Sequence, residues 1–339
     1  MSTVRTLILS ALTLPTLVFA QSSNTDLFSF VMPDAQLIAG AHVDSAKNSP
    51  FGQFVLQQMP IGGKYLQGFI TETGIDPRAD ISEIIGAWNG TPNATGRWLI
   101  AARGTFGSSI ETIEVNALEN GAVITRLPGV DLLAVTKPGM NTQQANLCIA
   151  LYTDGFTDLV GDCTTVNSAL QFGSNSAGAA SAIAMKARDL RAQQDLWFAS
   201  VVPLSELSSF APAGDGAPTG PLSGVFNSKL FSAIQQVSGG VRFPSAAQGS
   251  GAQLSGDIVM DTPQNATSLQ NIVNFLASLI QMNGNNVPAA NSIFALLANL
   301  QTSVSGNTLN IGLNVSETTL EQVFQQVSQL AQNHITQEN

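Results

Sequence analysis

Charged side chains are scarce in this sequence, and basic ones are the scarcer kind. Only 11% of the residues are charged, and 13 Lys and Arg face 23 Asp and Glu, so the formal net charge is −10. A protein that binds nucleic acid or an anionic lipid surface needs a basic footprint to neutralise phosphates. The composition therefore excludes a nucleic-acid partner and argues against docking on anionic lipid. The hydrophobic content of 44% is that of a globular protein.

Histidine is also rare, since the chain of 339 residues holds two. His334 lies in the C-terminal tail, so a Ser-His-Asp or Cys-His arrangement would have to use His42. We expect His42 to lie in a strand, with Asp44 on the same solvent-facing side, as a polar surface pair. The sequence contains no G-x-S-x-G, P-loop or G-x-G-x-x-G pattern and no Cys/His cluster with metal-ligand spacing. We therefore predict no catalytic residue, no metal site and no cofactor.

Carboxylates are the remaining groups with chemical potential. Asp154, Asp158 and Asp162 are spaced by four residues but lack the dense acidic pattern of a calcium loop. We interpret them as solvated acids of a turn. Glycoside hydrolysis needs two carboxyl groups about 5–9.5 Å apart, and the sequence nominates no such pair.

The N-terminus has the pattern of a secretory signal peptide. Residues 6–20 form an uncharged, mostly apolar run after a single basic residue, and Val18 and Ala20 place small side chains before Gln21. The run contains Pro15 and is shorter than the roughly 20 residues of a spanning helix. We predict cleavage between Ala20 and Gln21, no transmembrane segment in the mature chain, and a secreted or periplasmic location. An uncleaved anchor is the alternative.

Two cysteines fit an oxidising compartment. Cys148 and Cys163 flank two apolar runs joined by an Asp154-Gly155 turn signal, which predicts a β-hairpin. A four-residue loop would place the cysteines opposite each other, whereas a two-residue loop would pair Cys148 with Gly161 and offset the sulfurs. We predict a disulfide between Cys148 and Cys163; two buried free thiols are the alternative.

Hydrophobic periodicity predicts both strands and helices. Alternation over 254–260 and 308–315 indicates strands with one buried face, which favours antiparallel pairing. Apolar stripes at helical spacing predict helices over 108–118, 179–193, 268–280 and 319–331. The predicted fold class is α+β, with antiparallel sheets and helices packed on one face.

The order of the predicted elements suggests two related halves. Each half has an opening strand, a helix and a further strand, at 37–43, 65–73 and 97–104 in the first and at 196–202, 229–237 and 253–261 in the second. Each then continues with a helix and a closing strand-turn-strand-helix unit. We predict a signal peptide over 1–20, an N-terminal α+β half over 21–178 and a C-terminal α+β half over 179–339. A duplication is the hypothesis that accounts for this order.

Three segments carry a resemblance to a known group of proteins. They are VMPDAQLIAGAHVDSAKNSPFGQFVLQQM at 31–59, WLIAARGTF at 98–106 and GDCTTVNSAL at 161–170. In these segments the chain resembles uncharacterised exported bacterial proteins that open with an MPDA…SPFGQ segment. The resemblance implies export and an α+β architecture, and it implies no activity.

These observations favour a non-catalytic role, in binding or in structure, for an exported protein. Apolar helices against a sheet can enclose a small apolar ligand, which is one expected partner; an envelope protein is the other. A hydrolase of polysaccharide or peptide that uses carboxylates alone is an alternative function, and a subunit of a cell-envelope complex is another.

Overall fold

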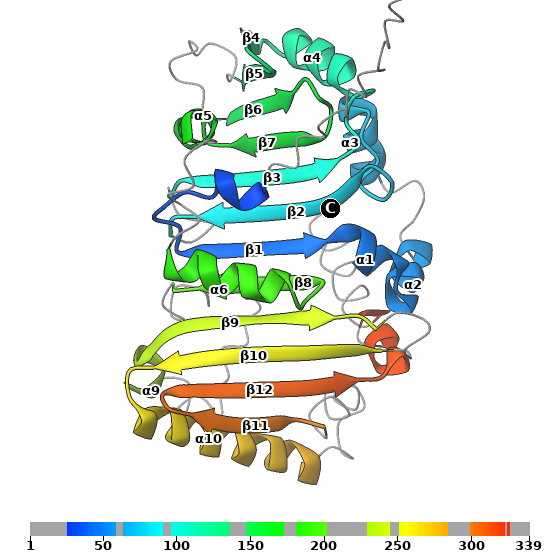
Figure 1. Ribbon diagram of the computed structural model, residues 1–339. Helices are drawn as coiled ribbons and strands as arrows, with labels where there is room; N and C mark the ends of the chain where they lie inside the picture. Colours follow the sequence, from blue (N-terminus) through cyan, green and yellow to red (C-terminus); the bar gives the residue numbers. More distant parts are fainter. Residues whose placement is uncertain are drawn as a thin grey trace, which may run out of the picture.

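One open, antiparallel sheet of 12 strands runs through the computed structural model of the chain (Figure 1). The structure describes residues 26–58, 64–90, 96–135, 147–172, 181–201, 229–244, 251–283, 299–322 and 324–325. The strands are β1 (Leu37–His42), β2 (Ile81–Trp88), β3 (Trp98–Gly104), β4 (Val123–Leu127), β5 (Val130–Val135), β6 (Leu147–Tyr152), β7 (Thr157–Gly161), β8 (Leu196–Ser200), β9 (Ile234–Arg242), β10 (Ala252–Met260), β11 (Gln301–Ser305) and β12 (Thr308–Val315).

The strand order places β1 and β8 side by side at the centre of the sheet. The full order is β11-β12-β10-β9-β8-β1-β2-β3-β7-β6-β5-β4. Read outward from the β1–β8 pair, it is β1-β2-β3-β7-β6 on one side and β8-β9-β10-β12-β11 on the other, with the β5–β4 hairpin added to the first. A duplicated unit would produce this correspondence. The relation between the halves stays a prediction, as does the boundary at 178/179, because residues 173–180 lie outside the described part of the chain.

Helices pack against both faces of the sheet. They are the 3-10 helix η1 (Leu27–Phe30) and the α-helices α1 (Val43–Asn48), α2 (Pro50–Gln58), α3 (Lys64–Thr73), α4 (Ile110–Glu119), α5 (Cys163–Phe172), α6 (Ala182–Arg191), α9 (Lys229–Ser232) and α10 (Pro263–Asn283). Successive residues of a strand point to opposite faces, and β5 shows the consequence. Leu132 belongs to the core with η1, α5 and α6, whereas Leu133 packs with Ile113 of α4.

The predicted α+β class with antiparallel pairing is confirmed. Among the predicted helices, those over 108–118, 179–193 and 268–280 correspond to α4, α6 and α10. The helix predicted over 319–331 falls mostly outside the described residues. In this region the described residues 317–322 and 324–325 are helical. No helix among the described residues is both long enough and apolar enough to cross a membrane.

The helix predicted over 229–237 is wrong beyond its first turn. Helix α9 ends at Ser232, and strand β9 begins at Ile234. Ile234, Val237 and Val241 have helical spacing, which is the origin of the error. Strand β9 pairs with both β8 and β10, so tertiary pairing outweighs the local pattern.

A buried carboxylate lies where β2, β3 and α6 meet. Glu83 of β2 is 5% exposed. Its two oxygens accept hydrogen bonds from Nε and Nη2 of Arg191 in α6, at 2.5 and 2.9 Å, and Oε2 also accepts one from Nη1 of Arg103 in β3, at 3.1 Å. Removal of such partners would leave a buried charge at a cost of several kcal/mol. These contacts therefore fix α6 against the N-terminal strands.

The same arginine reaches η1. Arg191 Nη1 donates to Asp26 at 3.0 Å, and Arg188 Nη2 donates to the other Asp26 oxygen at 2.9 Å. Both guanidinium groups lie over the ring of Phe28, 5.1 Å away for Arg188 and 5.7 Å for Arg191, and Phe28 stacks on Trp197 of β8. Cations over an aromatic face are attracted to it. Helix η1, α6 and β8 thus form one packed unit across the centre of the sheet.

Candidate functional site

The β6–β7 hairpin positions the first wall of the candidate site. Cys148 pairs with Gly161 and Leu151 with Asp158, which is the register of the two-residue loop. Gly155 has a φ of 74°, in the left-handed region that glycine adopts most easily. The hairpin signal of the Asp154-Gly155 pair is therefore confirmed, with the offset register and with residues 153–156 between the two strands.

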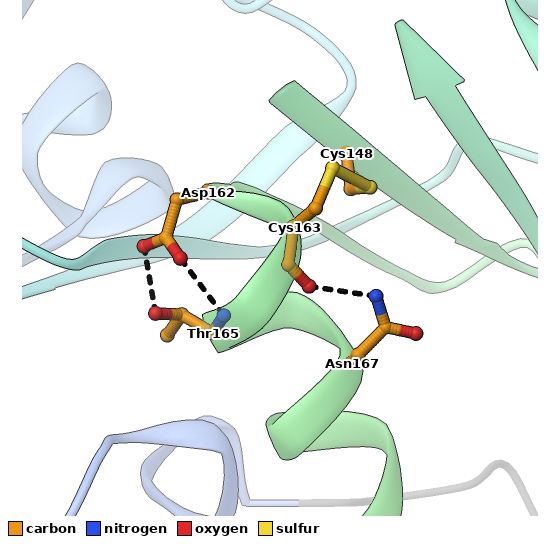
Figure 2. The surroundings of a disulfide bond; sticks show 5 residues. All are labelled: Cys148, Asp162, Cys163, Thr165 and Asn167. Carbon is orange, nitrogen blue, oxygen red and sulfur yellow. Dashed lines mark hydrogen bonds between the residues drawn. A yellow bond between two sulfur atoms is a disulfide. The ribbon is translucent and has the colours of Figure 1, made fainter. Parts of the chain in front are cut away.

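A disulfide joins Cys148 and Cys163 despite this register. Cys163 is the first residue of α5, just beyond the strand, and the turn of the chain into the helix brings its Cα within 4.7 Å of the Cα of Cys148 (Figure 2). The predicted disulfide is present in the structure. It ties the start of α5 to β6.

Asp162 holds the same helix start by hydrogen bonds. Its carboxylate accepts from Thr165 N at 2.9 Å and from Thr165 Oγ1 at 2.6 Å (Figure 2), and also from Trp98 N at 2.8 Å. The two Thr165 bonds are those of an N-cap, which satisfies a free backbone donor of the first turn. Helix α5 is thus anchored at one end by a covalent bond and by a shared carboxylate.

Helix η1 and the segment after it form the second wall. The Asp26 carboxylate accepts a hydrogen bond from Phe28 N at 3.2 Å and so caps η1. Phe30 is 3% exposed and packs edge-on against Tyr152 of β6. Val31 and Met32 are also buried. An apolar floor results between η1 and α5.

A pocket of about 390 Å³ lies between these two walls. It is lined by Ser29, Phe30, Val31, Met32, Pro33, Asp34, Arg97, Thr165, Ser168 and Ala169. Known small-molecule sites have volumes of about 300–1,000 Å³, mostly apolar linings and a few polar groups that orient the ligand. This pocket has that size and composition.

The polar groups of the pocket differ in whether their hydrogen-bonding capacity is already used. The Oγ of Ser29 is buried and has no hydrogen-bond partner. At the rim, Arg97 forms an ion pair with Asp34, and both side chains are about half exposed. The hydroxyls of Thr165 and Ser168 are already used, as donors to Asp162 and to the Thr164 carbonyl. Ser29 therefore offers the interior an unused donor and acceptor, and Arg97 offers the mouth a cation.

The three aspartates around the hairpin have separate roles, and the interpretation of all three as solvated turn acids is wrong. Asp154 accepts a hydrogen bond from Phe156 N at 2.9 Å within the turn, and Asp162 caps α5. Asp158 is only 6% exposed, and its Oδ1 has no hydrogen-bond partner. Burial, and secondarily the Asp154 charge, raise the pKa of Asp158 to about 7, although a backbone hydrogen bond with Tyr152 acts in the opposite direction.

His42 lies in a strand as predicted, but its predicted pairing with Asp44 on a solvent-facing side is wrong. His42 is the last residue of β1, and Asp44 lies in α1, so the two do not share a strand face. The His42 side chain turns inward instead. Its Nε2 lies 2.9 Å from the Arg191 carbonyl oxygen and its Nδ1 lies 3.9 Å from Glu83 Oε1. The strand ends one residue earlier than the predicted range of 37–43.

The remaining site predictions have different outcomes. Ala20 and Gln21, the predicted cleavage residues, lie outside the described residues. Within the described ranges, no group of three or more His, Cys, Asp or Glu residues is arranged to hold a metal ion. Sequence reasoning missed Ser29, Met32 and Arg97, since they come from segments distant in sequence from α5. The MPDA motif and the GDCTTVNSAL segment meet at this pocket, and both belong to the segments that resemble exported bacterial proteins, which is the signal the sequence held.

The fold and the pocket together define an antiparallel α+β protein with a cavity of ligand size. No protein-family model matches the chain, and no curated protein matches it. Among solved structures, crystal form I of TP0453 is similar over 89% of this chain and 97% of that chain, with a TM-score of 0.45 and 8% sequence identity. The resemblance of residues 31–59 to exported bacterial proteins stays a prediction.

Loss of the disulfide should destabilise the fold. In the chain-entropy model, a bond that closes a loop of about 15 residues is worth about 3 kcal/mol, and 15 positions separate the two cysteines. We expect a reductant to lower the free energy of unfolding of the parent by about that amount, and the Cys148→Ala/Cys163→Ala variant to start from the lower value. Urea unfolding with and without dithiothreitol measures this. A parent unaffected by dithiothreitol would contradict the expectation, and the double variant, which has no bond to reduce, is the control.

The buried carboxyl of Asp158 should make stability depend on pH. Its pKa is about 7 in the folded chain against a reference of 3.8, so the folded state keeps a proton that the unfolded state releases. The free energy of unfolding should therefore fall as pH rises from about 4 to 7, by up to about 4 kcal/mol at about 1.4 kcal/mol per pH unit. Asp158→Asn should remove this contribution and stabilise the chain relative to the parent above pH 7. Urea unfolding at several pH values tests it, with the exposed Asp189→Asn as control; an equal pH slope in parent and Asp158→Asn would refute it.

Proposed function

We propose that this protein binds a small, mainly apolar molecule in the pocket between η1 and α5 and leaves it chemically unchanged. The observation that carries the proposal is the composition of the pocket. Phe30, Val31 and Met32 supply a buried apolar floor, while Ser29 supplies one unpartnered buried hydroxyl. Burial of apolar ligand surface drives such binding at about 25 cal/mol per Å², and the hydroxyl would select a ligand with one polar group.

The rim of the pocket extends this specificity. Arg97 already pairs with Asp34, which also accepts a hydrogen bond from Asn89. The guanidinium has five N–H donors, so it retains donors for a carboxylate, sulfonate or carbonyl at the mouth. An amphipathic ligand with its apolar part inside and its polar end at Arg97 fits this arrangement.

We infer further that the protein acts outside the cytoplasm, in the periplasm or after secretion. The Cys148–Cys163 disulfide supports this location, because such bonds persist in oxidising compartments. The predicted signal peptide over 1–20 has the same implication. Together they support ligand binding in the cell envelope or beyond it.

A carboxylate-dependent hydrolase and a subunit of an envelope complex stay alternative predictions. Hydrolysis by carboxylates needs two acids in one cleft. The pocket between η1 and α5 is lined by one acid, Asp34, and this side chain is engaged in an ion pair with Arg97. The pocket therefore favours binding over hydrolysis.

Binding of 1-anilinonaphthalene-8-sulfonate tests the proposal, because this probe combines an apolar aromatic body with one anionic end. Ser168→Phe would place a ring in the pocket from the partly exposed side of α5. Gln171→Phe adds the same ring to an exposed position of the same helix. We expect the probe to bind the parent and Gln171→Phe alike and to bind Ser168→Phe at least about tenfold more weakly, a difference of about 1.4 kcal/mol.

Fluorescence titration gives the affinities, and thermal unfolding shows that both variants are folded. Equal affinity of the parent and Ser168→Phe would contradict the proposal. An equal loss of affinity in both variants would do the same, because it would place the probe on the outer surface of α5.

A further inference from the structure

The C-terminal half of the sheet has a polar face that the proposed function does not use. On the side of α6, helix α6 contacts β9 and its Lys186 pairs with Asp257 of β10, and no other helix among the described residues lies over β9, β10 and β12 (Figure 1). Side chains opposite each other in a pair of strands share a face. The register aligns Arg242 with Gln253 and Gln253 with Asn314, and this row faces the same side as Trp197, which packs in the core with α6.

Two glycines lower the floor of this face. The neighbouring row runs from Gly240 to Ser255 and Gly312 and ends at Gln301 in β11. A Cβ at Gly240 would lie 2.5 Å from Cγ of Gln194, so the glycine allows the Gln194 side chain to lie flat across β9. A Cβ at Gly312 would have nothing nearer than 4.0 Å. A shallow hollow therefore forms above Gly312, between Gln194 and Gln301.

The hollow continues toward the centre of the sheet. One depression of about 390 Å³ lies over β10 and β12, and a second of about 410 Å³ lies beside His42 and Phe243. Both are lined by Gln193, Gln194 and Arg242, so together they form one elongated groove. Its length suits a chain molecule better than a single small ring.

The groove has hydrogen-bonding groups that remain unused. Gln194 Nε2 donates to Ser255 Oγ at 3.1 Å, but Gln194 Oε1 is buried without a partner. Arg242 is exposed and makes no ion pair or hydrogen bond through its side chain with any described residue. A buried acceptor without a partner costs free energy that a ligand hydroxyl would recover. Gln194 and Arg242 line both depressions, so these two side chains belong to the same groove.

The chemistry of the lining selects the class of ligand. The half of the groove over β10 and β12 has amide and hydroxyl side chains and one charge, Arg242. Amide side chains supply both hydrogen-bond donors and acceptors. A hydroxyl group also donates and accepts hydrogen bonds, so the two are complementary. At the other end Phe243, stacked on Phe51, offers an apolar ring to the C–H face of a sugar. An anionic ligand would find one cation without a partner among the described residues, Arg242, and an apolar ligand would find little apolar surface.

We propose that this groove binds a neutral, hydroxyl-rich chain, that is, a glycan of several sugar units. The site is separate from the pocket between η1 and α5 and lies on other strands. A protein with both sites would hold a small apolar molecule while attached to a polysaccharide.

Isothermal titration with maltohexaose, cellohexaose and chitohexaose, and with hexagalacturonate as an anionic counterpart, tests the proposal. Gly312→Val fills the hollow, and the free space above Gly312 admits the new side chain. Asn310→Val adds the same side chain on the same strand face two residues away and removes one long hydrogen bond, of 3.4 Å, from Asn310 Nδ2 to the Ser303 carbonyl. We expect at least one neutral hexasaccharide to bind the parent and Asn310→Val equally and to bind Gly312→Val at least about tenfold more weakly.

Several results would overturn this proposal. They are no binding of any neutral hexasaccharide, binding of hexagalacturonate alone, or equal affinity of the parent and Gly312→Val. Thermal unfolding of the variants shows whether a loss of binding is due to a loss of the folded structure. Binding of 1-anilinonaphthalene-8-sulfonate should be the same in Gly312→Val and in the parent, so failure here leaves the η1–α5 pocket unaffected.

Discussion

The pairing of Glu83 with Arg191 is the interaction on which the arrangement of this protein depends. Glu83 comes from β2, in the N-terminal half, and Arg191 from α6, which precedes the first strand of the C-terminal half. Replacement of a buried ion pair by apolar residues is often neutral, whereas loss of one partner costs about 3–5 kcal/mol. The pair therefore acts mainly as a constraint: in this position of α6, Arg191 bonds both Glu83 and Asp26, and Arg188 bonds Asp26.

This constraint positions both candidate sites. Through Asp26 it fixes η1, which forms one wall of the apolar pocket. Through α6 it fixes the chain that enters β8, and Gln193 and Gln194 in that connection line the polar groove. The disulfide and the Asp162 cap complete the pocket from the other side by holding α5. Two candidate sites of opposite character thus depend on one central cluster.

Local patterns were sufficient for much of the fold. The alternation in β12 and the helical stripes of α4 and α10 each reflect one apolar face that packs against a core. The Asp-Gly turn between β6 and β7 reflects one local backbone conformation. The pattern failed for β9, where helical spacing of Ile234, Val237 and Val241 competed with pairing on both sides. Strand β2 was not predicted, although its pairing with β1 and β3 is extensive.

The candidate site was much less accessible to sequence reasoning. The cysteines could be paired because they flank one hairpin, whereas Ser29 and Ser168 meet only through the tertiary fold. Asp158 and His42 were placed in solvent because polar residues usually lie there. In the structure, one is buried in the sheet and the other contacts Arg191. Such placements depend on what packs over a strand, and the strand's own residues do not specify it.

We infer that the β1–β8 pair and the Glu83–Arg191 contact make the two halves one cooperative structure. Hydrogen exchange followed by mass spectrometry, at increasing urea, compares β3 with β10 most directly. We expect the amides of both strands to exchange through one shared opening, so that the free energy of opening has the same dependence on urea in both. Separate openings, with β10 exposed while β3 stays protected, would contradict it.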